Sequence, residues 1–168
     1  MEVTVSVRGT LHIYSCPPAL CPHVEWALAH ELGTAVTLTW RPQSMALGML
    51  RTEGQWQGPI GASGRLATVL KGWAMLRFDV TEEPSPGCDG ERYSFTPALG
   101  LFHATTSANG DIMVREDRLR AVVGAGGGDL RELMRSLGGL LGSAWDGELE
   151  PYRRAADGPP EHRLTRVV

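Results

Sequence analysis

Hydrophobic and polar residues alternate along several short stretches of this chain, as they do in β-strands that bury one face. In residues 10–15, Leu11 and Ile13 point to one side and the residues between them point to the other. Similar stretches predict further strands, namely residues 35–40, 53–57, 75–80, 101–106 and 111–114. The last two flank Asn109-Gly110, which favours a tight turn, so we expect them to form a hairpin.

Two segments of the first half show helical spacing instead. The first helix should cover residues 22–32, because Pro22 suits the first helical position and Gly33 is a typical stop. The second opens in a glycine-rich turn at residues 58–64. Its apolar stripe has the spacing i, i+3, i+4, i+7 and consists of Leu66, Val69, Leu70 and Trp73. We expect both helices to pack on the same face of a sheet.

The second half is mainly helical. We predict a short helix at residues 116–123, a flexible glycine hinge at 124–128, and a helix that follows the N-cap Asp129. The apolar stripe of that helix is Leu130, Leu133, Met134, Leu137, Leu140, Leu141 and Ala144. A last helix at 146–156 and an edge strand at 164–168 would complete the chain.

The order of the elements up to residue 80 is β-α-β-β-α-β, the split arrangement of ferredoxin-like domains. We therefore predict an α+β fold with a ferredoxin-like core, extended by the hairpin and a C-terminal helical layer. The chain has 168 residues, of which 42% are hydrophobic and 21% charged, so it is long enough to bury a core. We expect one domain, residues 1–168.

Charge and hydropathy exclude some classes of protein. The net charge is −3 without a basic run, which argues against a nucleic-acid-binding protein. No stretch approaches the roughly 20 apolar residues that span a membrane, and the N-terminus does not resemble a secretory signal. Three cysteines are an odd number and form no dense framework, so we expect free thiols and a cytoplasmic protein.

The most suggestive chemistry lies where the first helix begins, at Cys21, His23 and Glu25. A helix N-terminus favours a thiolate. Residues two apart on a helix nevertheless point about 200° away from each other, so the three cannot all face one ligand. His23 instead shares a face with Trp26 and His30. A structural helix start, a ligand or partner contact, and a catalytic or metal site all stay open.

We place the candidate binding site at this helix N-terminus. A plausible neighbour from another strand is His103, and the candidate binding residues are Cys21, His23, Glu25, Trp26 and His103. Zinc needs about four ligands with recognisable spacing, and no second Cys/His cluster follows. We therefore expect no metal and no cofactor, and we assign no catalytic residue.

A second candidate is the turn at residues 58–65, which follows a strand and opens a helix, where backbone N–H groups can hold an anion. Its G-x-x-G-x-x-G spacing is neither the P-loop spacing nor the dinucleotide-binding one. The alternative is a tight strand-to-helix turn. The candidate anion-binding residues are Gly58, Gly61, Gly64 and Arg65.

Residues 145–152 are acidic and aromatic, and they resemble a calcium loop only superficially. We interpret them as a solvated helix start with carboxylates in its first turn. Most of the tryptophans should lie in the core, although one or two exposed ones could mark an interface. The five are Trp26, Trp40, Trp56, Trp73 and Trp145.

Four stretches of the sequence resemble a family. They are ALCPHVEWA (19–27), WQGPIG through LKGW (56–73), LGLFHATTSANGDIMVREDRLR (99–120) and AWDGELEPYRRA (144–155). They resemble an actinobacterial family of small conserved proteins without an assigned function, over about residues 8–157. Cys16 departs from the family's pattern. Members of the family lie beside genes for fatty-acid synthesis or pyruvate oxidation, so the resemblance implies a role near acyl metabolism.

Two hypotheses of function stay open. The first is a non-enzymatic binding or regulatory module that docks on a metabolic enzyme or carrier protein. It is favoured by the poor catalytic geometry and the many tryptophans. The second is a small acyl- or coenzyme A-type ligand binder or enzyme that uses Cys21 and the Gly58–Gly64 turn. We expect the first, with a protein partner of unknown identity, and we keep a homo-oligomer as a further option.

Overall fold

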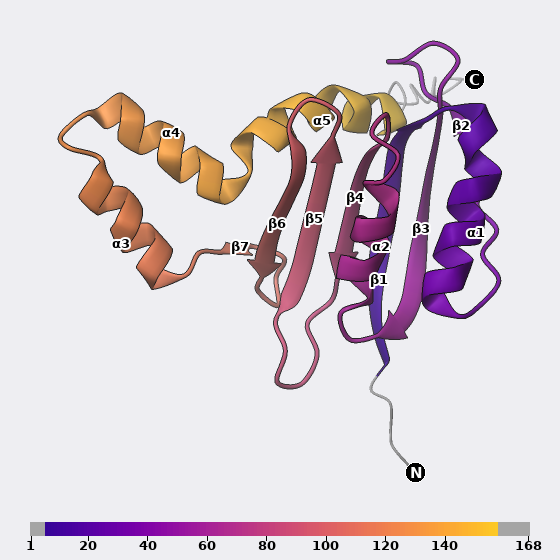
Figure 1. Cartoon of the computed structure of the whole chain (residues 1–168), viewed down its shortest axis with the longest axis horizontal. Coiled ribbons are helices and arrows are strands. Elements are labelled where there is room, and N and C mark those ends of the chain that lie inside the picture. Colours follow the sequence, from indigo (N-terminus) through magenta and orange to yellow (C-terminus); the bar gives the residue numbers. More distant parts are fainter. Residues whose placement is uncertain (1–5, 158–168) are drawn as a thin grey trace, which may run out of the picture.

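In the computed structural model, which describes residues 6–157, the strands form one seven-stranded sheet (Figure 1). Its order is β2-β3-β1-β4-β5-β6-β7, and every neighbouring pair is antiparallel. The strands are β1 (Ser6–Cys16), β2 (Arg41–Pro42), β3 (Leu50–Pro59), β4 (Arg77–Glu82), β5 (Gly90–Thr96), β6 (Gly100–Thr106) and β7 (Ile112–Met113). Together with five α-helices they confirm the predicted α+β class.

Two helices cover one face of the sheet, as predicted (Figure 1). They are α1 (Cys21–Leu32), which follows the short 3-10 helix η1 (Pro18–Leu20), and α2 (Ala62–Leu70). α1 ends where Gly33 takes the left-handed conformation, with φ of 68°. The apolar face of β1 packs beneath both helices. The largest fully buried residues of this layer are Ile13, Val24, Leu66, Leu70, Leu76, Phe78 and Val80.

The hairpin and the C-terminal helices are also confirmed. β6 and β7 are joined by a turn in which Gly110 has φ of 84°. Three helices follow, namely α3 (Glu116–Ala125), α4 (Leu130–Leu141) and α5 (Ser143–Asp157). The N-cap of α4 is Asp129, whose carboxylate accepts a hydrogen bond from the Arg131 amide at 2.9 Å. α3 and α4 form a helical hairpin that extends away from the sheet (Figure 1).

α5 lies against the other face of the sheet. Side chains alternate along β1, so Tyr14 points away from α1 and α2. The Tyr14 hydroxyl donates to the Asp79 carboxylate of β4 at 2.8 Å, and Arg153 of α5 donates to the same carboxylate at 2.6 Å. Ser94 of β5 donates to it at 2.5 Å. This buried network fixes α5 across three strands.

Some predicted elements differ from the structure. Residues 35–40 are extended but form no strand, and only Arg41 and Pro42 pair with β3. No strand is predicted at β5, although Tyr93 and Phe95 alternate with polar residues there. Trp73 lies beyond the end of α2 and is only half-buried against the core.

The ferredoxin-like assignment stays a prediction. The elements from β1 to β4 follow the order β-α-β-β-α-β, but β2 has two residues. In addition, β5, β6 and β7 continue the sheet beyond β4. The predicted edge strand at 164–168 lies outside the described residues, and the expectation of one domain over residues 1–168 stays a prediction.

Candidate functional site

Cys21 begins α1 and is buried, with 6% of its surface exposed. Its thiol donates to the sulfur of Cys16, at 3.9 Å, and lies 3.6 Å from the Pro17 carbonyl oxygen. Burial raises the pKa of Cys16 to about 12, and burial likewise raises the pKa of Cys21 above its ordinary value. Both thiols are therefore protonated at neutral pH, and neither presents the thiolate that a nucleophile requires.

The other residues of the first turns of α1 have different surroundings. His23 and Trp26 are exposed, and the Trp26 ring stacks on His30 with centroids 5.8 Å apart. Trp26 is 71% exposed. Glu25 instead points to the segment that follows α1. Its carboxylate accepts hydrogen bonds from the Leu38 amide at 3.0 Å and from the Trp40 indole N–H at 2.9 Å.

The glycine turn does hold an anion, but that anion is the protein's own Glu82. This side chain at the end of β4 is 5% exposed. It accepts from the Gly61 amide at 2.8 Å, the Ser63 amide at 3.0 Å and the Ser63 hydroxyl at 2.7 Å. The guanidinium of Arg65 lies 3.7 Å from Glu31 of α1. The amide groups that would bind an external anion at Gly61 and Ser63 are therefore used by Glu82.

His103 lies on β6, and its ring nitrogen Nε2 is hydrogen-bonded to the Glu91 carboxylate of β5. Its ring stacks on Tyr93, with centroids 4.5 Å apart. β6 lies three strands from β1, whose end leads into α1, so the structure does not bring His103 to Cys21. Four of the five predicted binding residues thus lie on α1, and His103 lies apart from them on β6. Their role in binding stays a prediction.

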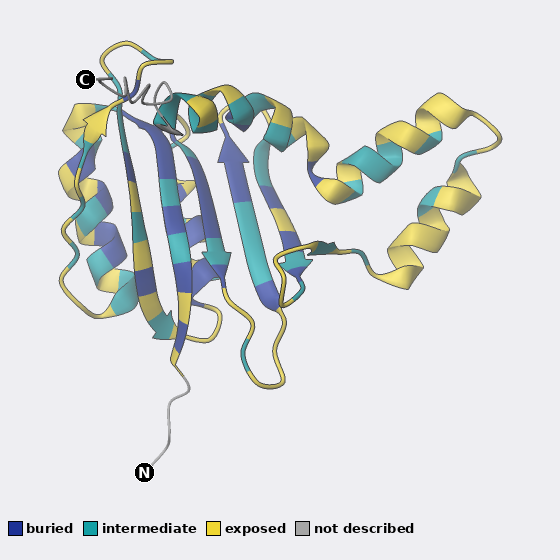
Figure 2. Ribbon diagram, turned by 180° about the vertical axis from the view of Figure 1, so that it is seen from behind, coloured by how far each residue is buried: buried dark blue, intermediate teal, exposed yellow. Residues whose placement is uncertain are grey.

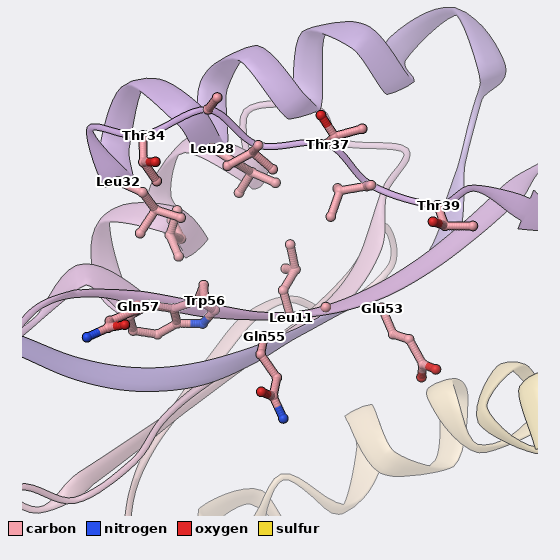
Figure 3. Close-up of a pocket in the computed structure, with 15 residues that line it drawn as sticks. Leu11, Leu28, Leu32, Thr34, Thr37, Thr39, Glu53, Gln55, Trp56 and Gln57 are labelled. Carbon is pink, nitrogen blue, oxygen red and sulfur yellow. The ribbon is translucent and has the colours of Figure 1, made fainter.

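A cavity of about 340 Å³ lies between α1, β3 and the connector, defined as residues 34–40 (Figure 3). It is lined by the consecutive residues 53–57 of β3 and by the consecutive residues 34–39 of the connector. Successive side chains of a strand point to opposite faces, so only its edge presents consecutive residues to one space. The cavity therefore lies beside the outer edge of β3.

The inner wall of the cavity is apolar and comes from the core, whereas its rim is polar. The wall consists of Leu11, Leu28, Leu32, Trp56 and Leu66. Figure 3 shows Glu53 and Gln55 pointing away from the cavity. Gly54 has no side chain to fill the space between β3 and the connector. A Cβ atom at this position would lie 3.5 Å from the Leu38 side chain. The cavity can take an extended ligand, and Glu53 is the one titratable residue among those that line it.

The acidic segment at the start of α5 is less solvated than predicted. Asp146 accepts hydrogen bonds from Arg92 at 2.6 Å and Arg153 at 2.9 Å, and Leu149 is fully buried. Burial acts to raise the pKa of Asp146, but the bonds from Arg153 and Arg92 outweigh it and hold this pKa below its ordinary value. These contacts attach α5 to the sheet.

Sequence reasoning missed Glu82, the Asp79 network and the cavity. Asp79 and Arg153 are 74 residues apart, and no local pattern links them. The cavity has one signal in the sequence, which is the strand-like alternation of the connector. In the structure this segment has no paired strand beside it. Within residues 6–157, no group of three or more His, Cys, Asp or Glu side chains could hold a metal ion. No helix in the same range is long and apolar enough to cross a bilayer.

Comparison with known proteins identifies the family. A family model described as a protein of unknown function (DUF3145) matches residues 10–166, so the chain belongs to this family. No curated protein and no solved structure matches the chain. The resemblance to a family without an assigned function is thereby confirmed.

Proposed function

We propose that this member of the DUF3145 family is a non-enzymatic docking module that binds a partner protein through its α3–α4 hairpin. The observation that carries the proposal is the exposure of the apolar stripes on this hairpin. Five large apolar side chains are more than 40% exposed, and they are Leu119, Val123, Leu130, Met134 and Leu141. No residue of either helix is buried, and Figure 2 shows both helices as largely exposed.

The base of the hairpin is rigidly attached to the sheet. α4 ends at Gly142, which has φ of 74° and lies so close to Phe102 that a Cβ atom would come within 2.7 Å of its ring. The next turn places Trp145 against Phe102, with centroids 5.2 Å apart, and the indole donates to the Gly100 carbonyl at 2.9 Å. The exposed apolar surface is therefore presented by a fixed support, which lowers the entropic cost of binding.

The charges on the hairpin are largely used within it. Glu116 pairs with Arg120 at 2.6 Å, and Glu132 pairs with Arg135 at 2.6 Å. The surface therefore favours an apolar partner over a strongly charged one. The exposed fractions of the five apolar residues correspond to nearly three whole side chains. Covering them would contribute about 4–8 kcal/mol before the cost of association. An amphipathic helix of the partner could cover these apolar side chains with its own apolar face.

Two observations support docking over the alternative of an acyl- or coenzyme A-type ligand bound at Cys21 and the glycine turn. Cys21 is buried, and the amides of the turn at Gly61 and Ser63 already bond Glu82. The class of partner, a metabolic enzyme or a carrier protein near acyl metabolism, comes from the family resemblance. We place this interaction in the cytoplasm.

The test compares two matched double variants of the tagged protein in cells of the native organism. Leu130→Ser/Met134→Ser removes 68% and 65% exposed side chains from the hairpin. Leu47→Ser/Met45→Ser removes the same residue types, 104% and 51% exposed, from the loop before β3. We expect the hairpin variant to lose its co-purifying partner by about tenfold or more, while the loop variant keeps it. Both should unfold at wild-type temperature.

The same variants define what would overturn the proposal. A partner that the hairpin variant retains at the wild-type level would show that this surface is not used. Light scattering of the purified protein tests whether the hairpin binds a second copy of this chain instead of a different protein. If the hairpin variant loses only self-association, the hairpin joins copies of this chain, and docking on a different protein is contradicted.

A further inference from the structure

β2 pairs with β3 over two residues, and the connector that precedes β2 does not continue this pairing. Arg41 lies opposite Arg51 and Pro42 opposite Leu50. Continued in register, this pairing would place residue 39 opposite 53, 37 opposite 55 and 35 opposite 57. Within residues 6–157, no backbone hydrogen bond joins residues 34–40 to residues 52–59, and the cavity lies between them instead. The sheet thus has one vacant strand position beside β3.

Glu25 keeps this position open. It accepts the Leu38 amide and the Trp40 indole N–H, so the Leu38 amide is turned toward α1 and away from β3. Leu38 and Trp40 also pack against the core, which holds the connector at a distance from β3. Both sides of the cavity therefore present backbone groups that have no backbone partner in the described chain.

These two sides determine the kind of ligand. A hydrocarbon chain would leave the N–H and C=O groups of β3 and the connector unpaired away from water, which costs free energy. An extended peptide satisfies them, as in the recognition mode in which a ligand adds a strand to a sheet edge. The cavity follows five residues of β3, or about 17 Å at roughly 3.3 Å per residue, so about five residues of a longer extended peptide would lie along it.

The lining also selects side chains. Alternate residues of the peptide would face the apolar wall that includes Leu28, Leu32 and Trp56, and the residues between them would face solvent. A second hollow of about 220 Å³ adjoins the cavity at Thr39 and Glu53. It is lined by Arg41 and Arg51, neither of which forms an ion pair within residues 6–157.

The closed end of the pair is suited to a negative charge. Arg41 and Arg51 are directly opposite each other, and like charges in that position repel unless an anion lies between them. Thr52 lines the same hollow, and its buried hydroxyl has no hydrogen-bond partner within the described residues. A polar ligand group there would satisfy it.

We infer that the cavity between the connector and β3 binds an extended peptide by strand addition. The peptide has small or branched apolar residues at alternate positions, and a carboxylate at the end beside Arg41 and Arg51. This site is distinct from the α3–α4 hairpin and does not depend on docking there.

The probe is a fluorescein-labelled peptide, Thr-Val-Thr-Leu-Thr-Val-Glu, with a free C-terminal carboxylate. We expect its fluorescence anisotropy to rise on titration with the full chain, with a Kd below about 100 μM. The same peptide N-methylated at its central amides should bind at least about tenfold more weakly, because it lacks the donors that pair with the sheet edge. Equal binding of the N-methylated peptide, or no binding up to about 1 mM, would overturn the inference.

Variants locate the peptide in the cavity. Arg41→Gln/Arg51→Gln should weaken the affinity for the carboxylate peptide by about fivefold or more. The same double variant should bind an uncharged form of the peptide, with Gln in place of Glu and an amidated C-terminus, as tightly as wild type does. Arg118→Gln/Arg131→Gln removes two exposed arginines from the hairpin as the charge-matched control, and it should bind like wild type. Gly54→Leu fills the cavity and should abolish binding in a protein that melts like wild type.

Dodecanoate distinguishes a hydrocarbon ligand. Weak or absent displacement of the peptide agrees with a site that needs main-chain donors and acceptors. If dodecanoate instead binds the wild-type chain more tightly than the peptide, and Gly54→Leu abolishes that binding, the cavity is an acyl site and the peptide inference is wrong. Loss of peptide binding in both arginine double variants would also contradict it, because the effect would then be one of net charge.

Discussion

Replacing Glu82 by alanine should destabilise the protein far more than replacing its sequence neighbour Glu83 by alanine. Its carboxylate is nearly fully buried and accepts three hydrogen bonds, from the Gly61 amide, the Ser63 amide and the Ser63 hydroxyl. Removing it leaves three donors without a partner at the N-terminus of α2, in a site where Ser63 has no exposed surface. It also removes a negative charge that the helix dipole stabilises.

The magnitude follows from these contacts. A hydrogen bond to a charged group contributes about 1.5–3 kcal/mol, and bonds to one carboxylate are not additive. We therefore expect Glu82→Ala to cost about 3–5 kcal/mol of unfolding free energy. Glu82→Gln keeps the shape and one acceptor oxygen, and it should lose about half as much.

The neighbouring residue provides the control. The side chain of Glu83 is exposed and pairs with that of Arg8, which is also exposed, at 3.4 Å, so Glu83→Ala should cost less than about 0.5 kcal/mol. Urea unfolding followed by circular dichroism measures all three variants, and at a slope of about 2 kcal/mol/M the midpoint of Glu82→Ala should fall by about 1.5–2.5 M. A Glu82→Ala midpoint within the error of Glu83→Ala would refute the claim that this carboxylate holds the start of α2.

Three further predictions concern α5 and the thiols. Asp79→Asn should lower the unfolding free energy by about 3 kcal/mol in urea unfolding, because it leaves Arg153 with a weakened partner in a buried network. The pKa of Asp146 is depressed in the folded protein, so its contribution is complete above the unfolded pKa, about 3.9, and is lost as the pH falls through the folded value. Wild type should therefore lose more stability than Asp146→Asn between about pH 5 and pH 3 in urea titrations. Iodoacetamide should modify the exposed Cys88 well before the buried Cys21, as peptide mass spectrometry would show, and equal rates would contradict the burial of Cys21.

Local patterns predicted most of the elements in this fold. The α1 segment carries Pro22 in its first turn and Gly33 at its end, and both positions act through backbone geometry that any tertiary context preserves. The same holds for the Asn109-Gly110 turn and for the Asp129 cap of α4. At these positions prediction was accurate because the cause lies within a few residues.

Sequence patterns were insufficient where a distant side chain decides the outcome. The connector has the pattern of a strand, but Glu25 accepts its Leu38 amide and prevents the pairing. At the glycine turn, Glu82 from another strand bonds the amides of Gly61 and Ser63, and binding of an external anion there stays a prediction. Alternation and spacing describe which face a residue takes, and they contain no information about which carboxylate reaches it across the fold.

The two proposed binding elements lie at opposite ends of the sheet, and this has a consequence for how they act together. The hairpin follows β7, whereas the cavity lies beside β3, and β1, β4, β5 and β6 separate them. They share no side chain, and coupling between distant sites requires an element with two arrangements that both ligands bias differently. The strands between them are all paired antiparallel, with register shifts only at the end of β1, and α5 is bonded across β1, β4 and β5. A rigid sheet of this kind transmits no such bias, so a helical partner on the hairpin and a peptide in the cavity should bind independently.

A protein with two independent sites at its two ends can hold two chains at once. A single partner could also offer both a helix and an extended acidic segment. The affinity for such a partner then depends on the linker between its two segments rather than on any change in the sheet.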